Sequence, residues 1–149
     1  MWNHFFNNKI IMPKESRTYG FLLEDVMKDN FKYGYKPEDL WEASKKKKVI
    51  KYNMNDVKHW VYGPCWSKGD CFISIYQVLM QPKKFPEHVR RIKKADNKYP
   101  LIVIEDKYDK YGGILDGNHR FAKMVLQNKK KIPIVYFTKD ELNKLKIKM

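Results

Sequence analysis

Cysteine is scarce in this sequence: among 149 residues, the only cysteines are Cys65 and Cys71. Two thiols cannot build a disulfide framework, and they provide only half of the ligands of a four-cysteine zinc site. Disulfide-rich chains belong to oxidising compartments. The cysteine content therefore predicts an intracellular, cytoplasmic protein.

Long apolar runs are also missing. A helix that spans a membrane needs about 18–20 predominantly apolar residues in succession, and no run in the chain approaches that length. The first residues, MWNHFFNNKIIMP, lack the basic start and the small-residue cleavage site of a secretory signal. We therefore expect no membrane partner and no export signal.

Acidic residues are in deficit, and arginine is rare among the basic residues. The chain has 31 Lys and Arg against 17 Asp and Glu, a formal charge of +14, and its arginines are Arg17, Arg90, Arg91 and Arg120. A positive field of this size favours polyanionic partners such as nucleic acid or nucleotides. A lysine-rich surface is also typical of an AT-rich genome, viral or cellular, or of a need for solubility. Charge alone leaves these explanations open.

Apolar and aromatic residues are plentiful by contrast. With 43% hydrophobic and 15% aromatic residues, the chain is not a disordered tail, and its length suits one folded domain. The patterns predict an α/β fold with a small mixed sheet and packed helices. Strands are expected at 49–54, 100–105, 112–115 and 132–137, and helices at 74–79, 85–95, 118–128 and after Thr138.

The first 48 residues are expected to form a helical N-terminal extension, ahead of a domain over 49–149. Within this extension, residues 21–31 have apolar positions at helical spacing. Residues 36–48 begin with proline and acids and end with four lysines, which suits the helix dipole. The aromatic stretch at 59–72 is expected to be irregular.

The stretch YGGILDGNHRFAKMVL, residues 111–126, joins an apolar strand to an amphipathic helix through polar residues. The first turn of a helix carries unpaired amides and a partial positive charge, so an oxyanion fits there. Gly117 would let a ligand approach the backbone, because no Cβ stands in the way. The predicted phosphate-binding residues are Gly117, Asn118, His119, Arg120 and Lys123.

Asp116, which precedes this turn, allows more than one interpretation. Its carboxylate either caps the helix by accepting free amide hydrogens or holds a metal ion or a substrate hydroxyl. In the first case the stretch is an ordinary Asp-Gly turn with a histidine at the surface. The local pattern leaves both interpretations open.

The segment PLIVIEDKYDKYGGILDGNHRFAKMVLQNKKKIPIVYF resembles the ParB/sulfiredoxin fold superfamily. Its members share a strand, a D-G-x-H-R turn, a helix, a short basic loop and an apolar strand. The resemblance covers residues 100–137 and extends back through 74–99, which resembles the helical segment of bacterial and viral ParB-like proteins. It implies a phosphate site in which Gly117, His119 and Arg120 match the phosphate-binding part of the motif and Asp116 its leading acid.

The resemblance also implies a ligand class. Superfamily members bind ATP, ADP or CTP, phosphorylate serine, or are described as nucleases, which implies such a nucleotide with Mg²⁺ here. Sulfiredoxin has its reactive cysteine between the Gly and the His of the motif, where this chain has Asn118. An amide cannot attack a sulfinyl phosphate, so we expect no sulfiredoxin activity.

Three residues away from the turn are further candidates. Glu87, beside His88, would supply an acid next to a possible base, or else it only complements the dipole of its helix. Asp70 lies in a loop that would close over the pocket as a lid, or that is an ordinary polar turn. Trp66 would stack on a nucleobase, or it belongs to the core.

Together these patterns predict a ParB/sulfiredoxin-like protein that binds a nucleotide, DNA or RNA through phosphate at the DGNHR turn. Asp116, as a metal ligand, with Glu87 or Asp70, would be catalytic in a Mg²⁺-dependent phosphotransferase, NTPase or nuclease. The alternative is a non-catalytic basic module that binds nucleic acid or a host protein. A second acid in the pocket would favour the enzyme, and a flat basic face would favour the binding module.

Overall fold

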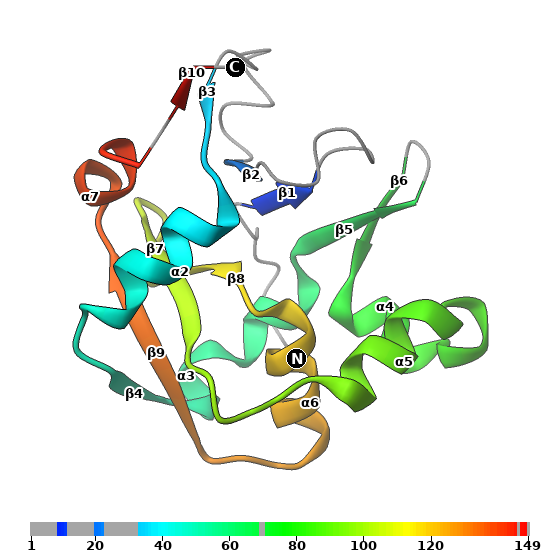
Figure 1. The fold of residues 1–149 in the computed structure, drawn as a ribbon. Helices are drawn as coiled ribbons and strands as arrows, with labels where there is room; N and C mark the ends of the chain where they lie inside the picture. Colours follow the sequence, from blue (N-terminus) through cyan, green and yellow to red (C-terminus); the bar gives the residue numbers. More distant parts are fainter. Residues whose placement is uncertain (1–8, 12–19, 23–32, 69–70, 146, 149) are drawn as a thin grey trace.

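A computed structural model describes residues 9–11, 20–22, 33–68, 71–145 and 147–148 (Figure 1). Its helices are α2 (Pro37–Lys45), α3 (Met54–Val57), α4 (Ile75–Met80), α5 (Pro86–Lys94), α6 (Asn118–Leu126) and α7 (Lys139–Asn143), with 3-10 turns η2 (Lys58–Tyr62) and η3 (Pro82–Lys84). Its strands are β1 (Lys9–Ile11), β2 (Gly20–Leu22), β3 (Tyr33–Gly34), β4 (Ile50–Asn53), β5 (Pro64–Lys68), β6 (Cys71–Ser74), β7 (Leu101–Asp106), β8 (Asp109–Asp116), β9 (Lys131–Phe137) and β10 (Ile147–Lys148). No helix within these ranges is long and apolar enough to cross a membrane.

The centre of the fold is a four-stranded mixed sheet in the order β4-β9-β7-β8, which confirms the predicted α/β class with a small mixed sheet. β7 and β8 form an antiparallel hairpin, while β9 runs parallel to β7 and antiparallel to β4. α6 connects β8 to β9 and so inserts β9 between β4 and β7. The start of α6 therefore lies where β8 leaves the sheet.

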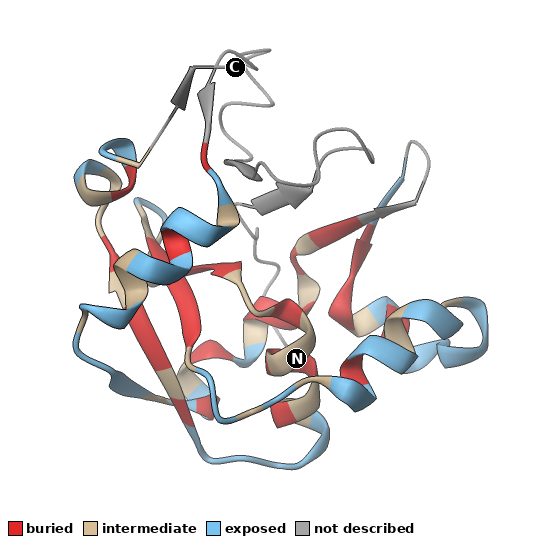
Figure 2. Cartoon of the chain, in the orientation of Figure 1, coloured by how far each residue is buried: buried red, intermediate tan, exposed pale blue. Residues whose placement is uncertain are grey.

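Side chains of the sheet alternate between two faces, and each face has its own core. Figure 2 shows that buried residues run along the central strands and recur in the helices around them. On β7, Leu101 and Val103 pack with buried residues of α5 and α6. Ile102 and Ile104 point the other way and pack with buried residues of α2 and α7. Successive side chains of a strand point to opposite faces of the sheet. Because both faces of β7 are buried, its residues are apolar on both sides. Helices therefore cover both faces of the sheet.

Two of the predicted helices, α4 and α7, begin with capping boxes. Ser74 accepts a hydrogen bond from the Gln77 amide at 3.1 Å, and the Gln77 side chain accepts one from the Ser74 amide at 2.8 Å. Thr138 and Glu141 make the same reciprocal pair at the start of α7. These bonds satisfy amides that the first turn of each helix leaves unpaired.

The helix expected at 36–48 is confirmed as α2, which ends at Lys45. Leu40 of α2 and the preceding Tyr35 are buried in the core on the α7 side of the sheet. This part of the N-terminal segment therefore packs against the sheet. The boundary at residue 48 stays a prediction.

The description of residues 1–48 as a helical extension needs correction. Gly20–Leu22 forms strand β2, which pairs antiparallel with β1, so the beginning of the helix expected at 21–31 is a strand. Residues 23–32, the rest of that prediction, lie outside the described residues. A short apolar run suits a helix or a strand equally, and pairing with β1 decides between them.

The stretch 59–72 is regular where an irregular segment was expected. It contains most of the 3-10 turn η2 and an antiparallel pair, β5 and β6. The register shifts between Pro64 and Trp66, and Cys65 and Trp66 are both buried. An irregularity of this kind breaks the alternation by which a strand is recognised in sequence. Asp70, the proposed lid acid, lies outside the described residues.

Candidate functional site

Helix α6 begins at Asn118, as predicted, and Gly117 is its N-cap. The φ angle of Gly117 is +111°, in the left-handed region that favours glycine. A Cβ on Gly117 would lie 2.8 Å from both Arg120 Nη2 and Leu101 Cδ2. The turn therefore requires glycine because of its backbone angle and its close neighbours.

The N-cap residue of α6 is Gly117, and Asp116 precedes it. Its Oδ2 accepts a hydrogen bond from Trp41 Nε1 at 3.1 Å and lies 3.6 Å from Arg120 Nη2. Trp41 comes from α2, which packs on the opposite face of the sheet from α6. Asp116 therefore connects α2 to the first turn of α6.

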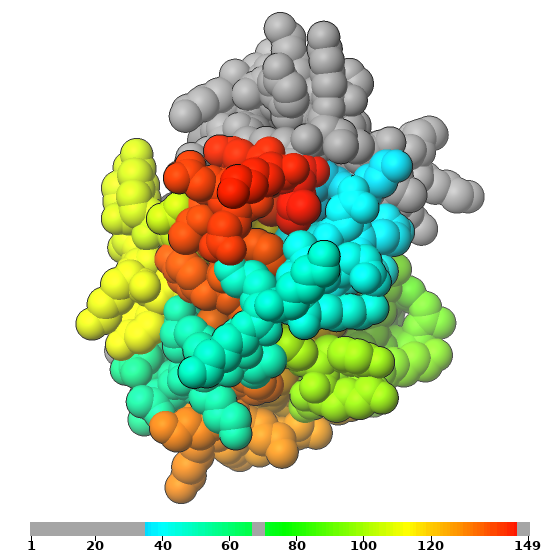
Figure 3. Space-filling model, turned by 60° about the vertical axis from the view of Figure 1, so that its left-hand side comes forward, coloured from blue at the N-terminus to red at the C-terminus, as the bar shows by residue number. Residues whose placement is uncertain are grey.

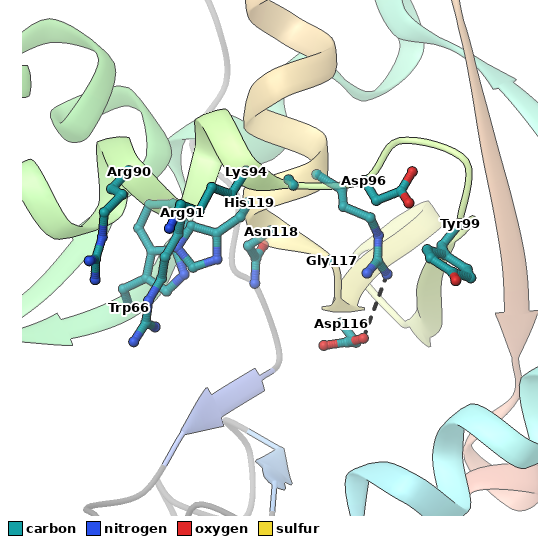
Figure 4. A pocket seen from close by; sticks show the side chains of 12 residues that line it. Trp66, Arg90, Arg91, Lys94, Asp96, Tyr99, Asp116, Gly117, Asn118 and His119 are labelled. Atoms are coloured by element: carbon teal, nitrogen blue, oxygen red, sulfur yellow. Dashed lines mark ion pairs between the residues drawn. The ribbon is translucent and has the colours of Figure 1, made fainter.

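The start of α6 opens into a cavity of about 460 Å³, which we call the α6 cavity (Figure 4). Four cationic side chains line it, namely Arg90, Arg91, Lys94 and Arg120, and its carboxylates are Asp96 and Asp116. The other lining residues are Trp66, Ala95, Tyr99, Gly117, Asn118 and His119. Cations thus outnumber acids two to one, which favours an anionic ligand.

The rare arginines of the chain gather at this cavity. Arg90, Arg91 and Arg120 line it, while the remaining arginine, Arg17, lies outside the described residues. Sequence reasoning named Glu87 as the candidate site residue of the helix at 85–95 and missed Arg90 and Arg91. The adjacent pair of arginines in a chain dominated by lysine was the signal, because arginine binds phosphate through a rigid fork of donors.

Arg120 is anchored at one end of its guanidinium. Nη2 donates to the Pro100 carbonyl at 3.1 Å and faces Asp116. Nε is buried and has no hydrogen-bond partner among the described residues. A buried donor without an acceptor lowers the stability of a protein by about 1–3 kcal/mol. The hydrogen-bonding capacity of the Arg120 side chain is therefore not fully used.

Trp66 and His119 line the α6 cavity, and the ring of His88, which does not line it, packs beside them. The His88 and His119 rings both stack on the Trp66 indole, with centroids 4.3 and 4.5 Å away. His88 Nδ1 and His119 Nε2 lie 3.1 Å apart, so one ring donates a hydrogen bond to the other. Trp66 is only 8% exposed and its indole already carries two imidazoles, so it belongs to the core and is no open platform for a base.

The stability of the protein is expected to fall as the pH decreases below the usual histidine value of 6.5. Burial and the nearby Arg91 lower the pKa of His88, against the opposing effect of Glu87. Because the pKa of His88 is lower in the folded protein than in the unfolded chain, the unfolded chain binds a proton at a higher pH. Between the two pKa values, a decrease in pH therefore lowers the free energy of unfolding. Urea unfolding at about pH 7.5 and about pH 5.5 measures the loss. A His88→Gln variant should lose less on acidification, and an unchanged loss would contradict this origin.

Two predicted site residues lie elsewhere. Glu87 does not line the α6 cavity; it is exposed and pairs with Arg90 and Arg91 on its own helix. Lys123 does not line the cavity either, because its Nζ donates to the carbonyls of Lys93 at 3.0 Å and Ala95 at 2.7 Å. Lys123 therefore caps the end of α5.

A Lys123→Met variant is expected to lose about 0.5–1.5 kcal/mol of stability, since it loses charged donors to the negative end of α5. Ligand binding at the α6 cavity should stay unchanged. Urea unfolding and a ligand titration measure the two effects, with Lys129→Met as the control on an exposed lysine. A large loss of binding without loss of stability would restore Lys123 to the site.

Magnesium does not fit the carboxylates of this site as they stand. The described residues contain no group of three or more His, Cys, Asp or Glu that could hold a metal ion. Asp116 is engaged by Trp41 and faces the Arg120 cation. Magnesium bound through one carboxylate needs additional oxygens from a substrate. We therefore assign no protein-built metal site to Asp116.

Comparisons of the chain with protein-family models, curated proteins and solved structures find no match. The likeness to the ParB/sulfiredoxin superfamily therefore depends on the sequence resemblance alone, which covers residues 100–137 and extends back through 74–99.

Proposed function

We propose that the α6 cavity binds a phosphate group of a nucleotide or a nucleic acid, in a domain of the ParB/sulfiredoxin type. The observation that carries the proposal is the gathering of Arg90, Arg91 and Arg120 at the first turn of α6. The three arginines come from two helices that are separate in the sequence. The motif resemblance implies a phosphate at the same turn and supports the proposal independently of the charges.

The contacts available in the cavity suit phosphate. Arginine donates two parallel hydrogen bonds to a phosphate, and the positive end of α6 adds a favourable dipole. A carboxylate ligand would meet the same cations but would present fewer acceptor oxygens.

The proposal is tested by thermal unfolding with ATP, ADP, CTP, inorganic phosphate or a short oligonucleotide, each with and without Mg²⁺. A ligand at about 100 times its dissociation constant stabilises a protein by about 2.7 kcal/mol. For a chain of this size that corresponds to a rise of about 5–11 °C in Tm. An Arg90→Ala, Arg91→Ala double variant should lose the rise, whereas Lys144→Ala, on an exposed lysine just after α7, should keep it. No rise with any of these ligands would overturn the proposal.

A second candidate function is phosphoryl transfer or hydrolysis, and Asp96 favours it. Asp96 lines the α6 cavity together with Asp116, so an acid other than Asp116 lies beside the proposed phosphate. Its carboxylate is 53% exposed and accepts a hydrogen bond from the Lys98 amide at 3.0 Å. A carboxylate beside a bound phosphate can act as a general base towards an attacking hydroxyl.

Turnover separates this enzyme from the non-catalytic alternative. Release of phosphate from the best-binding nucleotide is measured for the wild-type protein, Asp96→Asn and Asp116→Asn. Loss of turnover in Asp96→Asn with retained binding would make Asp96 catalytic. Binding without turnover in the wild-type protein would instead favour the basic binding module.

A further inference from the structure

A second cavity, of about 620 Å³, lies between α2 and the start of β7; we call it the α2 cavity. Apolar side chains form much of its lining, among them Trp41, Val49, Tyr99 and Pro100. In Figure 3 the cyan-to-teal side chains of α2 lie at the molecular surface next to yellow-green side chains of the region around α5. The lining includes three large or branched apolar side chains that are also substantially exposed: Trp41, Val49 and Tyr99.

The α2 cavity adjoins the α6 cavity. Tyr99, Asp116 and Arg120 line both cavities. In Figure 4, Tyr99 lies on the side of Asp116 away from Arg90 and Trp66. One ligand of moderate length can therefore occupy the two cavities together, with its middle beside Asp116 and Arg120.

The two cavities differ in charge. The α2 cavity is lined by equal numbers of acids and bases, Glu38, Glu42 and Asp116 against Lys45, Lys47 and Arg120. The α6 cavity is lined by four cations and two carboxylates, although Arg90 and Arg91 also pair with Glu87 outside it. The joined space is thus nearly neutral and aromatic at one end and cationic at the other, which matches a molecule with a flat uncharged ring and a phosphate.

The indole of Trp41 is held in place for such a contact. Its Nε1 donates to Asp116 Oδ2 at 3.1 Å, while Trp41 as a residue stays 47% exposed. The adjacent Leu40 is fully buried, which anchors this turn of α2 on the sheet. A fixed and exposed aromatic ring stacks at a smaller entropic cost than a free one.

We propose that the α2 cavity receives the heterocyclic base of a nucleotide, which stacks on Trp41, while the phosphates of the same nucleotide lie in the α6 cavity. This inference rests on the proposed function of the α6 cavity. Asp116 is then a positioning residue, because it holds Trp41 on one side and Arg120 on the other. Tyr99 completes the aromatic wall at the junction.

The test compares ligands with and without a base by isothermal titration. ATP and CTP should bind the wild-type protein more tightly than inorganic tripolyphosphate, which lacks a base. A Trp41→Ala variant should weaken ATP and CTP by about 5- to 150-fold, the usual effect of losing one base–aromatic stack. The same variant should leave tripolyphosphate binding unchanged. A short single-stranded oligonucleotide shows whether the base can also belong to a strand.

Two control variants keep the test specific. Tyr108→Ala removes an aromatic residue that is 86% exposed in the turn between β7 and β8, and it should bind every ligand like the wild type. Trp41→Phe keeps a stacking ring but removes one indole, so nucleotides should still bind while their quenching of tryptophan fluorescence decreases.

The outcomes separate the two proposals. Tripolyphosphate binding with no gain from a base, and no effect of Trp41→Ala on ATP or CTP, would overturn the base site and leave the phosphate site intact. No binding of tripolyphosphate, nucleotide or oligonucleotide would overturn the phosphate site itself.

Discussion

Replacing Arg120 with lysine is expected to weaken phosphate binding by about 1–3 kcal/mol, or about 5- to 150-fold, although the charge is kept. Lysine presents a point charge, whereas arginine presents a planar fork of donors. In this protein the Arg120 guanidinium also bonds the Pro100 carbonyl and faces Asp116, which fixes its orientation towards the α6 cavity. Isothermal titration with the ligand that most raises the melting temperature measures the change.

The control for this prediction is Lys123→Arg, a substitution one turn further along α6 that also exchanges one cation for another. It should leave the affinity within about twofold, since the Lys123 ammonium bonds the end of α5. Equal affinities for wild type and Arg120→Lys would show that only the charge of Arg120 matters, or that phosphate binds elsewhere.

A Gly112→Ala variant is expected to lose about 2–5 kcal/mol of stability. The φ angle of Gly112 is +80°, and a left-handed backbone costs a residue with a Cβ about 1–2 kcal/mol. The added Cβ would also lie 2.4 Å from the Ile104 carbonyl oxygen, and such crowding costs a further 1–3 kcal/mol or so. Urea unfolding measures the loss, which is a large part of a typical total stability of about 5–15 kcal/mol.

Gly117→Ala is the informative comparison for Gly112→Ala. Its backbone strain is similar, but the Cβ would meet the ends of two side chains, which can move, rather than a carbonyl of the sheet. We expect a smaller loss of stability, about 1–2 kcal/mol, together with weaker phosphate binding because Arg120 is displaced. A Gly112→Ala variant as stable as the wild type would show that the β7–β8 hairpin can shift to accept the methyl group.

Much of the fold could be predicted because its elements carry local signals. The capping residues Ser74 and Thr138 mark two helix starts, and the apolar runs of β7 and β9 have the length and composition of buried strands. The β5–β6 hairpin was not predicted, because its register irregularity places the adjacent Cys65 and Trp66 both in the core and so breaks the alternation of a strand. Strand β2 was not predicted, because its apolar residues suit a helix or a strand equally until the pairing with β1 is known.

The candidate site was predictable only at the turn itself. Asn118 begins α6 as expected, since Gly117 and the polar residues after it mark a helix start. The adjacent arginines of α5 were a signal for phosphate binding, but their position beside the turn was not predictable, because the packing of α5 against α6 depends on the whole core and not on spacing along one helix. Trp41 is the clearest case: its bond to Asp116 joins positions 75 residues apart.

The position of β9 has a consequence for how the chain assembles during synthesis. β9 comes last along the chain among the four strands of the sheet, yet it lies between β4 and β7 and pairs with both. Until β9 is made, the edge of β4 and the edge of β7 that β9 will join have no partner in this sheet, although β7 can already pair with β8 on its other edge. Unpaired strand edges are templates for association between chains, and pairing over long sequence separations is slow. The nascent protein therefore passes through a stage in which contact between neighbouring polypeptides competes with completion of its own sheet.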